Sequence, residues 1–368
     1  MTMTSPRLPR SADPDESTDP AGPSLPLSAL ERGGHAAGTT AEQAVRDVVD
    51  TARTAEAHGY RRFWVAEHHA VRTGVSSSPA VLIAHIAART ERIRVGSGGV
   101  MLPNHPPYTV AEQFATLQTL HPGRVDLGIG RPSGGSTEAH RLLEAALRRA
   151  PGAGTGFPAQ IDELLGVLFG RGPDRNRYHS LPLTPRPATP PEVHVLGAGT
   201  TSARLAGERG LPFVYGHHLS RAVCRPEAVE GYRSAFRPDP DHPGQDGTRP
   251  HLAVSVHVVC AETDELAESL ALRTAAHVAA RSGDAAPLGP SSPAREEHLA
   301  RRTLDEYQVV HGAPAKVAAE LAALAARFAA DELMIAPFEL TGQARARTLR
   351  LTARVRVAPP AHRAAARR

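Results

Sequence analysis

The chain has 368 residues, of which 41% are apolar and 4% aromatic. That length fits either two ordinary domains or one β/α barrel with long insertions. The net charge is +4, but the basic residues are scattered and Lys316 is the only lysine, which argues against a nucleic-acid partner and excludes the Gly-Lys pair of a phosphate-binding P-loop.

The compartment follows from the cysteines and from the lack of long apolar runs. Cys224 and Cys260 have no metal-like spacing and are too few for a disulfide framework. No stretch of about 18 consecutive apolar residues predicts a membrane span, and the N-terminal segment has no apolar signal-peptide run. We expect a cytoplasmic protein with neither a membrane nor a nucleic-acid partner.

The chain ends differ in composition from the rest. Residues 1–24 are rich in Pro, Ser, Asp and Thr, so they bury too little apolar surface to fold, and we predict a disordered N-terminal tail. We expect one folded domain over residues 25–356, followed by a C-terminal tail, 357–368. Segments 237–250 and 281–297 are Pro-, Gly- and Asp-rich and are predicted to be insertions or mobile loops.

Apolar runs and helical periodicity alternate along the folded region. Thr39 and Glu42 match a capping box, and Ser78-Pro79 matches an N-cap followed by a first-turn proline. Short apolar runs predict strands at 25–30, 63–66, 93–97, 125–129, 193–196, 213–215, 252–259 and 332–336. Periodicity predicts helices at 41–55, 79–89, 110–120, 161–169, 201–209, 264–278 and 315–329.

Strands that alternate with helices pair in parallel, as in α/β folds. About eight such units follow one another without a break. This count favours a single closed (β/α)8 TIM barrel, with insertions after several strands, over a doubly wound sheet.

Three ionisable residues, Glu67, His68 and His69, directly follow the second predicted strand. In β/α barrels, catalytic groups lie at this end of the strands. Extended backbone points His68 to one side and its two neighbours to the other. We take all three as candidate catalytic residues, with a pair of purely structural histidines as the alternative. No metal-ligand spacing occurs, so we predict no metal.

Glycines follow the next three strands. Gly98-Gly99 would bring bare backbone to the barrel mouth, where a flat cofactor ring could approach, or would form a simple bulge. Gly130-Arg131 places a cation beside a glycine, which suits a phosphate, although a surface salt bridge is the alternative. Gly199, Thr200, Thr201 and Ser202 open a helix whose N–H groups favour an anion, unless the hydroxyls are ordinary caps.

Residues 59–131 resemble the bacterial-luciferase-like flavin-dependent oxidoreductases and monooxygenases. The resemblance is carried by EHH at 67–69, GSGG at 96–99 and GIGR at 128–131, and continues more weakly over 26–31, 193–218 and 307–337. It implies a luciferase-like barrel that binds reduced FMN from a separate flavin reductase and uses O2 to oxidise a small-molecule substrate. We also expect a homodimer.

The resemblance also implies roles for individual residues. His68 would handle the proton beside the flavin, Gly98-Gly99 would form a non-proline cis peptide under the ring, and Arg131 with residues 199–202 would bind the phosphate. Gly130 stands where true luciferases carry a reactive cysteine, which argues against light emission. The segment 281–297 lies where the family has a mobile lid, although its composition fits a disordered insertion equally well.

The leading hypothesis is therefore an FMN-dependent monooxygenase of natural-product chemistry. One alternative keeps the barrel but uses a deazaflavin coenzyme for hydride transfer. A second alternative is a non-catalytic, luciferase-like flavin-binding protein. The first strand ends in Glu31-Arg32-Gly33-Gly34, where relatives carry Asp followed by Ser-Pro, so we expect the floor of the substrate pocket to differ there.

Overall fold

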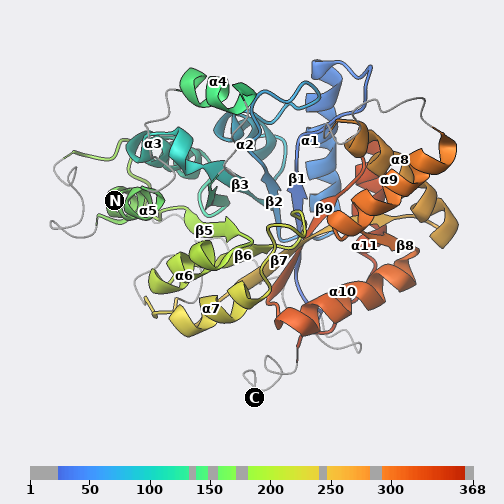
Figure 1. The fold of residues 1–368 in the computed structure, drawn as a ribbon. Helices are drawn as coiled ribbons and strands as arrows, with labels where there is room; N and C mark the ends of the chain where they lie inside the picture. The colour runs from blue at the N-terminus through green and yellow to red at the C-terminus, as the bar shows by residue number, and fades with distance from the viewer. Residues whose placement is uncertain are drawn as a thin grey trace, which may run out of the picture.

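The structure, a computed structural model, describes residues 24–131, 138–147, 156–170, 181–239, 247–281 and 292–360. Parallel strands gather at the centre of the molecule and helices surround them (Figure 1). The strands are β1 (Leu27–Glu31), β2 (Arg62–Val65), β3 (Arg94–Met101), β4 (Val125–Gly130), β5 (Glu192–Gly197), β6 (Phe213–Gly216), β7 (Leu252–Cys260), β8 (Val310–Gly312) and β9 (Glu332–Pro337).

The sheet closes on itself. Strands β1 to β7 pair in sequence order, and β9 pairs with both β7 and β1, which completes a ring of eight parallel strands. Strand β8 pairs only with the end of β7 and stands outside the ring. The predicted (β/α)8 barrel is therefore confirmed.

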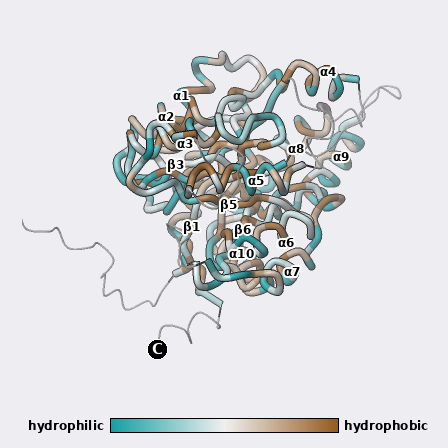
Figure 2. The backbone as a smooth tube through the Cα atoms, turned by 90° about the vertical axis from the view of Figure 1, so that its left-hand side faces the viewer, coloured by the Kyte–Doolittle hydropathy of each residue, from teal (hydrophilic) through white to brown (hydrophobic). Residues whose placement is uncertain are grey.

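Helices link successive strands and cover the outside of the ring. Figure 2 shows hydrophilic stretches on outer helices such as α4 and α10. Among the described residues, no helix has the length and apolarity needed to cross a membrane. The helices are α1 (Ala41–Ala57), α2 (Pro79–Ala87), α3 (Pro107–Leu120), α4 (Glu138–Ala146), α5 (Phe157–Phe169), α6 (Thr200–Glu208), α7 (Glu227–Ala235), α8 (Asp264–Arg281), α9 (Pro293–Glu306), α10 (Pro314–Phe328) and α11 (Gly342–Thr352), with a short 3-10 helix η1 (Leu102–Asn104) after β3.

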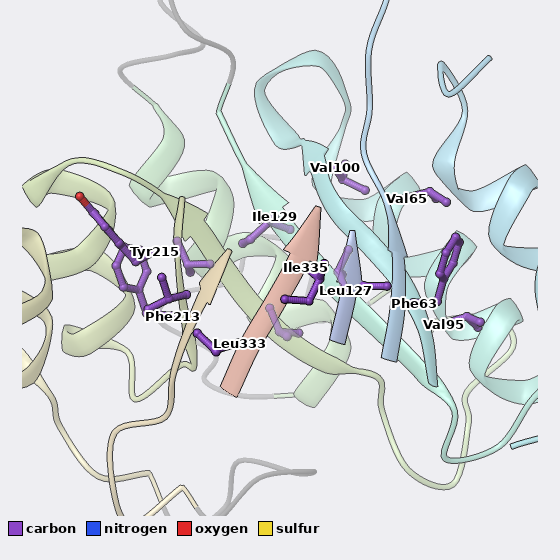
Figure 3. Packing of buried hydrophobic residues seen from close by; sticks show 14 of the residues in the cluster. Phe63, Val65, Val95, Val100, Leu127, Ile129, Phe213, Tyr215, Leu333 and Ile335 are labelled. Carbon is purple, nitrogen blue, oxygen red and sulfur yellow. The ribbon is translucent and has the colours of Figure 1, made fainter. Parts of the chain in front are cut away.

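Side-chain alternation along the strands builds two apolar layers. Figure 3 shows outward-facing residues such as Phe63 and Leu333, which belong to the large cluster between strands and helices. Their strand neighbours Trp64 and Met334 pack with Leu30 in a smaller cluster inside the ring. Because both faces of each strand are buried, the strands read as continuous apolar runs, which is why the sequence pattern predicts them.

The amino-terminal ends of the strands are closed by a buried ion cluster. The Arg62 guanidinium lies 2.9 Å from Asp126, 2.9 Å from Glu332 and 3.4 Å from Glu192. Burial alone would lower the pKa of Arg62, but the three carboxylates raise it. This cluster holds β2, β4, β5 and β9 together at the end of the barrel opposite the candidate catalytic residues.

One predicted helix start and one predicted loop differ from the structure. The side chain that caps α1 is Thr40, which accepts a hydrogen bond from Gln43 N, and not Thr39. The predicted loop 281–297 is partly helical, because α9 begins at Pro293. At the other end of this segment, Arg281 is the last residue of α8. Residues 282–291 lie outside the described residues. The Oγ of Ser292 caps α9 by accepting a hydrogen bond from Arg295 N. Ser292-Pro293 thus has the same start signal as Ser78-Pro79.

Parts of the chain for which no element was predicted contain structure as well. Helices α4, α7, α9 and α11 and strand β8 have no counterpart in the predicted set. The predicted N-terminal tail falls almost wholly on residues 1–23, outside the described residues. Beside it, Leu25 N donates a 2.7 Å hydrogen bond to Val357 O, so the two ends of the described chain lie against each other below β1.

Candidate active site

A cavity of about 290 Å³ opens at the carboxyl ends of strands β1 to β7. Its floor and walls include several glycines and apolar side chains, and its polar side chains are Arg32, His68, Arg131, His218, Ser255, His257 and Tyr307. A larger hollow of about 800 Å³ lies beside α9, but no strand residue lines it. Since β/α barrels place their chemistry at the carboxyl ends of the strands, the mouth cavity is the candidate active site.

His68 is the member of the Glu67-His68-His69 motif that reaches this cavity. Its Nδ1 donates a 3.2 Å hydrogen bond to the backbone oxygen of Arg32, which leaves Nε2 as the proton acceptor of a neutral ring. Although His68 is solvent-exposed, desolvation by the surrounding protein lowers its pKa, and the Arg32 guanidinium lowers it further, against the opposing effect of the hydrogen bond to Arg32 O. These effects favour the neutral imidazole, which can act as a base.

Glu67 and His69 are turned away from the cavity lining. Glu67 Oε1 accepts hydrogen bonds from His69 Nε2 at 2.7 Å and from His105 Nε2 at 2.9 Å, and Oε2 accepts one from Met101 N at 3.0 Å. Burial alone would raise the pKa of Glu67, but these donors hold it below its ordinary value. The carboxylate ties the loop after β2 to the end of β3 and fixes the backbone that carries His68.

The end of β3 has the cis peptide that the family resemblance implies and also the bulge that is the alternative interpretation of the glycines. The Gly98–Gly99 peptide bond is cis, and the pairing of β3 with β4 shifts between Ser97 and Val100, so the bulge also occurs. A Cβ on Gly98 would lie 2.4 Å from Leu30 Cδ1, and one on Gly99 would lie 2.9 Å from Gly128 O. The close packing of neighbouring strands therefore requires glycine here, and at this strand end bare backbone lines the cavity.

The predicted phosphate-binding residues fall into two groups. Gly130 and the exposed Arg131 line the cavity at the end of β4. Gly199 is the N-cap of α6, and no side chain caps that helix start, while Thr200, Thr201 and Ser202 form its first turn. This second group stands outside the cavity lining, next to Gly197, whose Cβ would lie 2.6 Å from Ser202 Cβ.

The model of the luciferase-like monooxygenase family matches residues 28–332. The chain belongs to this family. It is 35% identical over 307 residues to a luciferase-like monooxygenase of Escherichia coli (strain K12), a match that covers 81% of this chain and 87% of that one. It is 33% identical over 316 residues to N-acetyl-S-alkylcysteine monooxygenase of Bacillus subtilis (strain 168), covering 84% and 91%.

Solved structures of luciferase-like proteins share the fold. Apo-MsnO8 superposes with a TM-score of 0.74 at 33% identity, over 90% of this chain and 97% of that one. A type II Baeyer-Villiger monooxygenase from Pseudomonas putida in complex with FMN has a TM-score of 0.64 at 18% identity, over 91% and 99% of the two chains. An F420-dependent secondary alcohol dehydrogenase has a TM-score of 0.56 at 14%, over 89% and 97%.

The cavity of this luciferase-like monooxygenase includes two further histidines that the sequence analysis did not select. His218 Nδ1 lies 2.7 Å from Ser255 Oγ, and burial lowers the pKa of His218 to about 3. His257 Nδ1 donates to Ala336 O at 3.1 Å, and burial keeps its pKa well below the ordinary value. Ser255 and His257 occupy alternate positions of an otherwise apolar strand, a pattern that could have identified them.

Two further cavity residues follow β1 and α9. Arg32 directly follows β1, and its guanidinium lies 5.6 Å from the centre of the Phe338 ring, after β9. Tyr307 ends α9, and its ring centre lies 6.3 Å from that of His257. Segment 281–297, which is predicted as an insertion or mobile loop, thus overlaps the start of α9, and Tyr307 at the end of α9 lines the cavity.

Proposed function

We propose that this protein is an FMN-dependent monooxygenase that receives reduced FMN from a separate reductase and uses O2 to oxidise a small organic substrate. The observation that carries the proposal is the neutral imidazole of His68 facing a cavity whose floor is the bare Gly98–Gly99 backbone. A proton acceptor beside a flat, side-chain-free surface suits chemistry on a planar cofactor.

The cavity lining and the start of α6 beside it offer groups for both ends of FMN. Glycines at the ends of four strands offer backbone against which a flat ring can lie: Gly98, Gly99, Gly130, Gly197 and Gly216. Arg131 supplies a cation for a phosphate, and the uncapped first turn of α6 supplies N–H groups and the positive end of a helix dipole. When bound, reduced FMN supplies the electrons that activate O2.

The protein's own residues then have distinct tasks. The Nδ1–H of His68 is held by Arg32 O, so Nε2 accepts a proton from the reacting group and returns it later. Glu67 and His69 position the His68 backbone and make no contact with the reacting atoms. The apolar walls, with Leu30, Met101 and Val214 among them, exclude water from the ring.

The experiment compares cofactors directly. The protein is titrated anaerobically with reduced FMN and with a reduced deazaflavin, and oxygen uptake is then followed with FMN, a general flavin reductase and a substrate panel. The panel contains aldehydes, aromatic polyketides and N-acetyl-S-alkylcysteines, the last because the Bacillus relative is named for them. We expect tight binding of reduced FMN and uptake that depends on one of these substrates.

Two results would contradict the proposal. Preference for the deazaflavin, with no reaction with O2, would mean that the barrel carries out hydride transfer. Binding of reduced FMN with no substrate-dependent uptake across a broad panel would mean that it is a flavin-binding protein without turnover.

A further inference from the structure

The mouth cavity contains a cation without a matching carboxylate. Arg32 is half-buried after β1, and within the part of the chain that the structure describes its buried Nε has no hydrogen-bond partner. Among the residues that the structure describes, no Asp or Glu lines the cavity. An arginine stays charged even when burial lowers its pKa. A buried donor of a charged group that lacks an acceptor is a position that a ligand can satisfy.

The nearby carboxylates are engaged elsewhere. Glu31, the neighbour of Arg32 in the chain, lies 2.9 Å from Arg345 Nε and accepts a 2.8 Å hydrogen bond from Gly33 N. Glu67 accepts its hydrogen bonds from His69 and His105, behind the cavity. Neither acid is therefore available to form a direct ion pair with the Arg32 guanidinium.

The three histidines of the cavity cannot offset this charge, because an imidazole is either neutral or cationic. Burial lowers the pKa of His68, His218 and His257, and the positive charge of Arg32 lowers each one further. Aromatic side chains complete the surroundings, since Phe338 lies against both Arg32 and His257. Burial lowers the pKa of Arg32 and the nearby charge of Glu31 raises it, but the described cavity lining includes no acid, and in this partly enclosed space an ion pair is stronger than in water.

Arg32 is also well separated from the second arginine of the cavity. Arg131 follows β4, whereas Arg32 follows β1, and β2 and β3 stand between them in the closed ring. The uncapped start of α6 follows β5, on the far side of the ring from β1. A phosphate bound by Arg131 and α6 would leave Arg32 free for a second anion.

We propose that Arg32 binds an anionic group of the organic substrate, a carboxylate, at the β1 side of the mouth cavity. This inference rests on the proposed function, in which FMN takes the β4 and β5 side. Two N–H groups of the guanidinium match the two oxygens of a carboxylate. The substrate class is then a small organic acid, whose oxidisable part extends from Arg32 toward His68.

Sodium benzoate and benzamide are the probes, because they have nearly the same shape and differ in charge. Each is titrated calorimetrically into the protein saturated with FMN and into the flavin-free protein. The variants are Arg32→Gln, Arg32→Lys as a charge-retaining rescue, and Arg131→Gln. Arg92→Gln is the matched surface control, since Arg92 is exposed and pairs with Glu91.

We expect the wild-type protein to bind benzoate at least about tenfold more tightly than benzamide. This is the difference in affinity that one charge-assisted hydrogen bond provides. Arg32→Gln should abolish that preference, and Arg32→Lys, Arg131→Gln and Arg92→Gln should keep it. Equal binding of the two probes by the wild-type protein, or a preference that survives in Arg32→Gln, would overturn the proposal.

The FMN affinity of the same variants separates the two proposals. Arg32→Gln should bind FMN like the wild-type protein, and an equal loss of FMN and benzoate affinity would assign Arg32 to the flavin instead. If the wild-type protein bound no FMN, the proposed function would fail, while the benzoate preference of the flavin-free protein would still decide the role of Arg32.

Discussion

The Nδ1 atom of His68 lies 3.2 Å from the backbone oxygen of Arg32, so a single residue both orients the imidazole and, through its guanidinium, opposes protonation of that ring. The hydrogen bond fixes which nitrogen faces the cavity, and the charge adds to the larger effect of desolvation in lowering the pKa of the ring. Strands β1 and β2, which carry the two residues, are neighbours in the barrel.

This relationship predicts the pH dependence of His68. Burial lowers its pKa most, Arg32 and His69 lower it as well, and Glu67 and the hydrogen bond to Arg32 O raise it. Arg32→Gln removes the guanidinium but keeps the backbone oxygen, so the pKa of His68 should rise from below about 6.5 toward that ordinary value. An NMR titration of the His68 ring measures the shift.

Activity should follow the same direction. If neutral His68 is the base, activity is present above its pKa and is lost as the pH falls through it, so the acid limb should move to higher pH in Arg32→Gln. Arg92→Gln serves as the control. An unchanged His68 titration in Arg32→Gln would show that the guanidinium does not act on this ring.

Glu67 should behave as a positioning residue. Glu67→Gln replaces one acceptor oxygen by an amide and leaves buried donors of His69, His105 or Met101 unmatched, at a cost of about 1 to 3 kcal/mol in the free energy of unfolding. Urea unfolding measures this loss. If Glu67→Gln kept full stability while abolishing turnover, Glu67 would be acting on the reacting atoms.

Arg131 should act on the cofactor alone. Arg131→Ala should weaken binding of reduced FMN by about 1.5 to 3 kcal/mol, the range for a charge-assisted hydrogen bond, and leave thermal unfolding unchanged because the side chain is exposed. Anaerobic fluorescence titration gives the affinity. Unchanged affinity, with Arg92→Gln as reference, would remove Arg131 from the phosphate site.

The buried ion cluster at the other end of the barrel should matter for stability. Arg62→Leu leaves Asp126, Glu192 and Glu332 buried without their cation, so unfolding should require about 3 to 5 kcal/mol less. Arg92→Leu, at an exposed pair, should cost less than about 1 kcal/mol. Equal midpoints of the two variants in urea would contradict the assigned role of the cluster.

The sequence was most informative for the strands and least informative for the insertions. Phe63-Trp64-Val65 reads as a strand because its two faces pack against different apolar layers. The cap of α1 was placed one residue early, since Thr39 and Thr40 are chemically equivalent and only the backbone geometry distinguishes them. Helix α9 was missed because the Pro- and Ser-rich residues before it outweighed the Ser292-Pro293 start signal.

The sequence predicted the arrangement of site residues that follow a single strand. It did not predict contacts between site residues from distant parts of the chain. Alternation after β2 correctly separated His68 from its neighbours. The partner of Glu67, His105, comes from beyond the end of β3, and only the folded chain shows that contact. Among the described residues Arg32 Nε has no hydrogen-bond partner, and the neighbouring Glu31 pairs instead with Arg345, a residue near the other end of the chain.

The central claim concerns His68 and is tested most directly by single-turnover kinetics. Prereduced FMN bound to the protein is mixed with O2 and the best substrate of the panel, and product oxygen is traced with oxygen-18. Wild-type product should carry the label. His68→Ala should retain FMN affinity within about tenfold and lose rate by about 10² to 10⁴, whereas His69→Ala should act mainly through stability. Full rate in His68→Ala, or product without label in the wild-type reaction, would contradict the account.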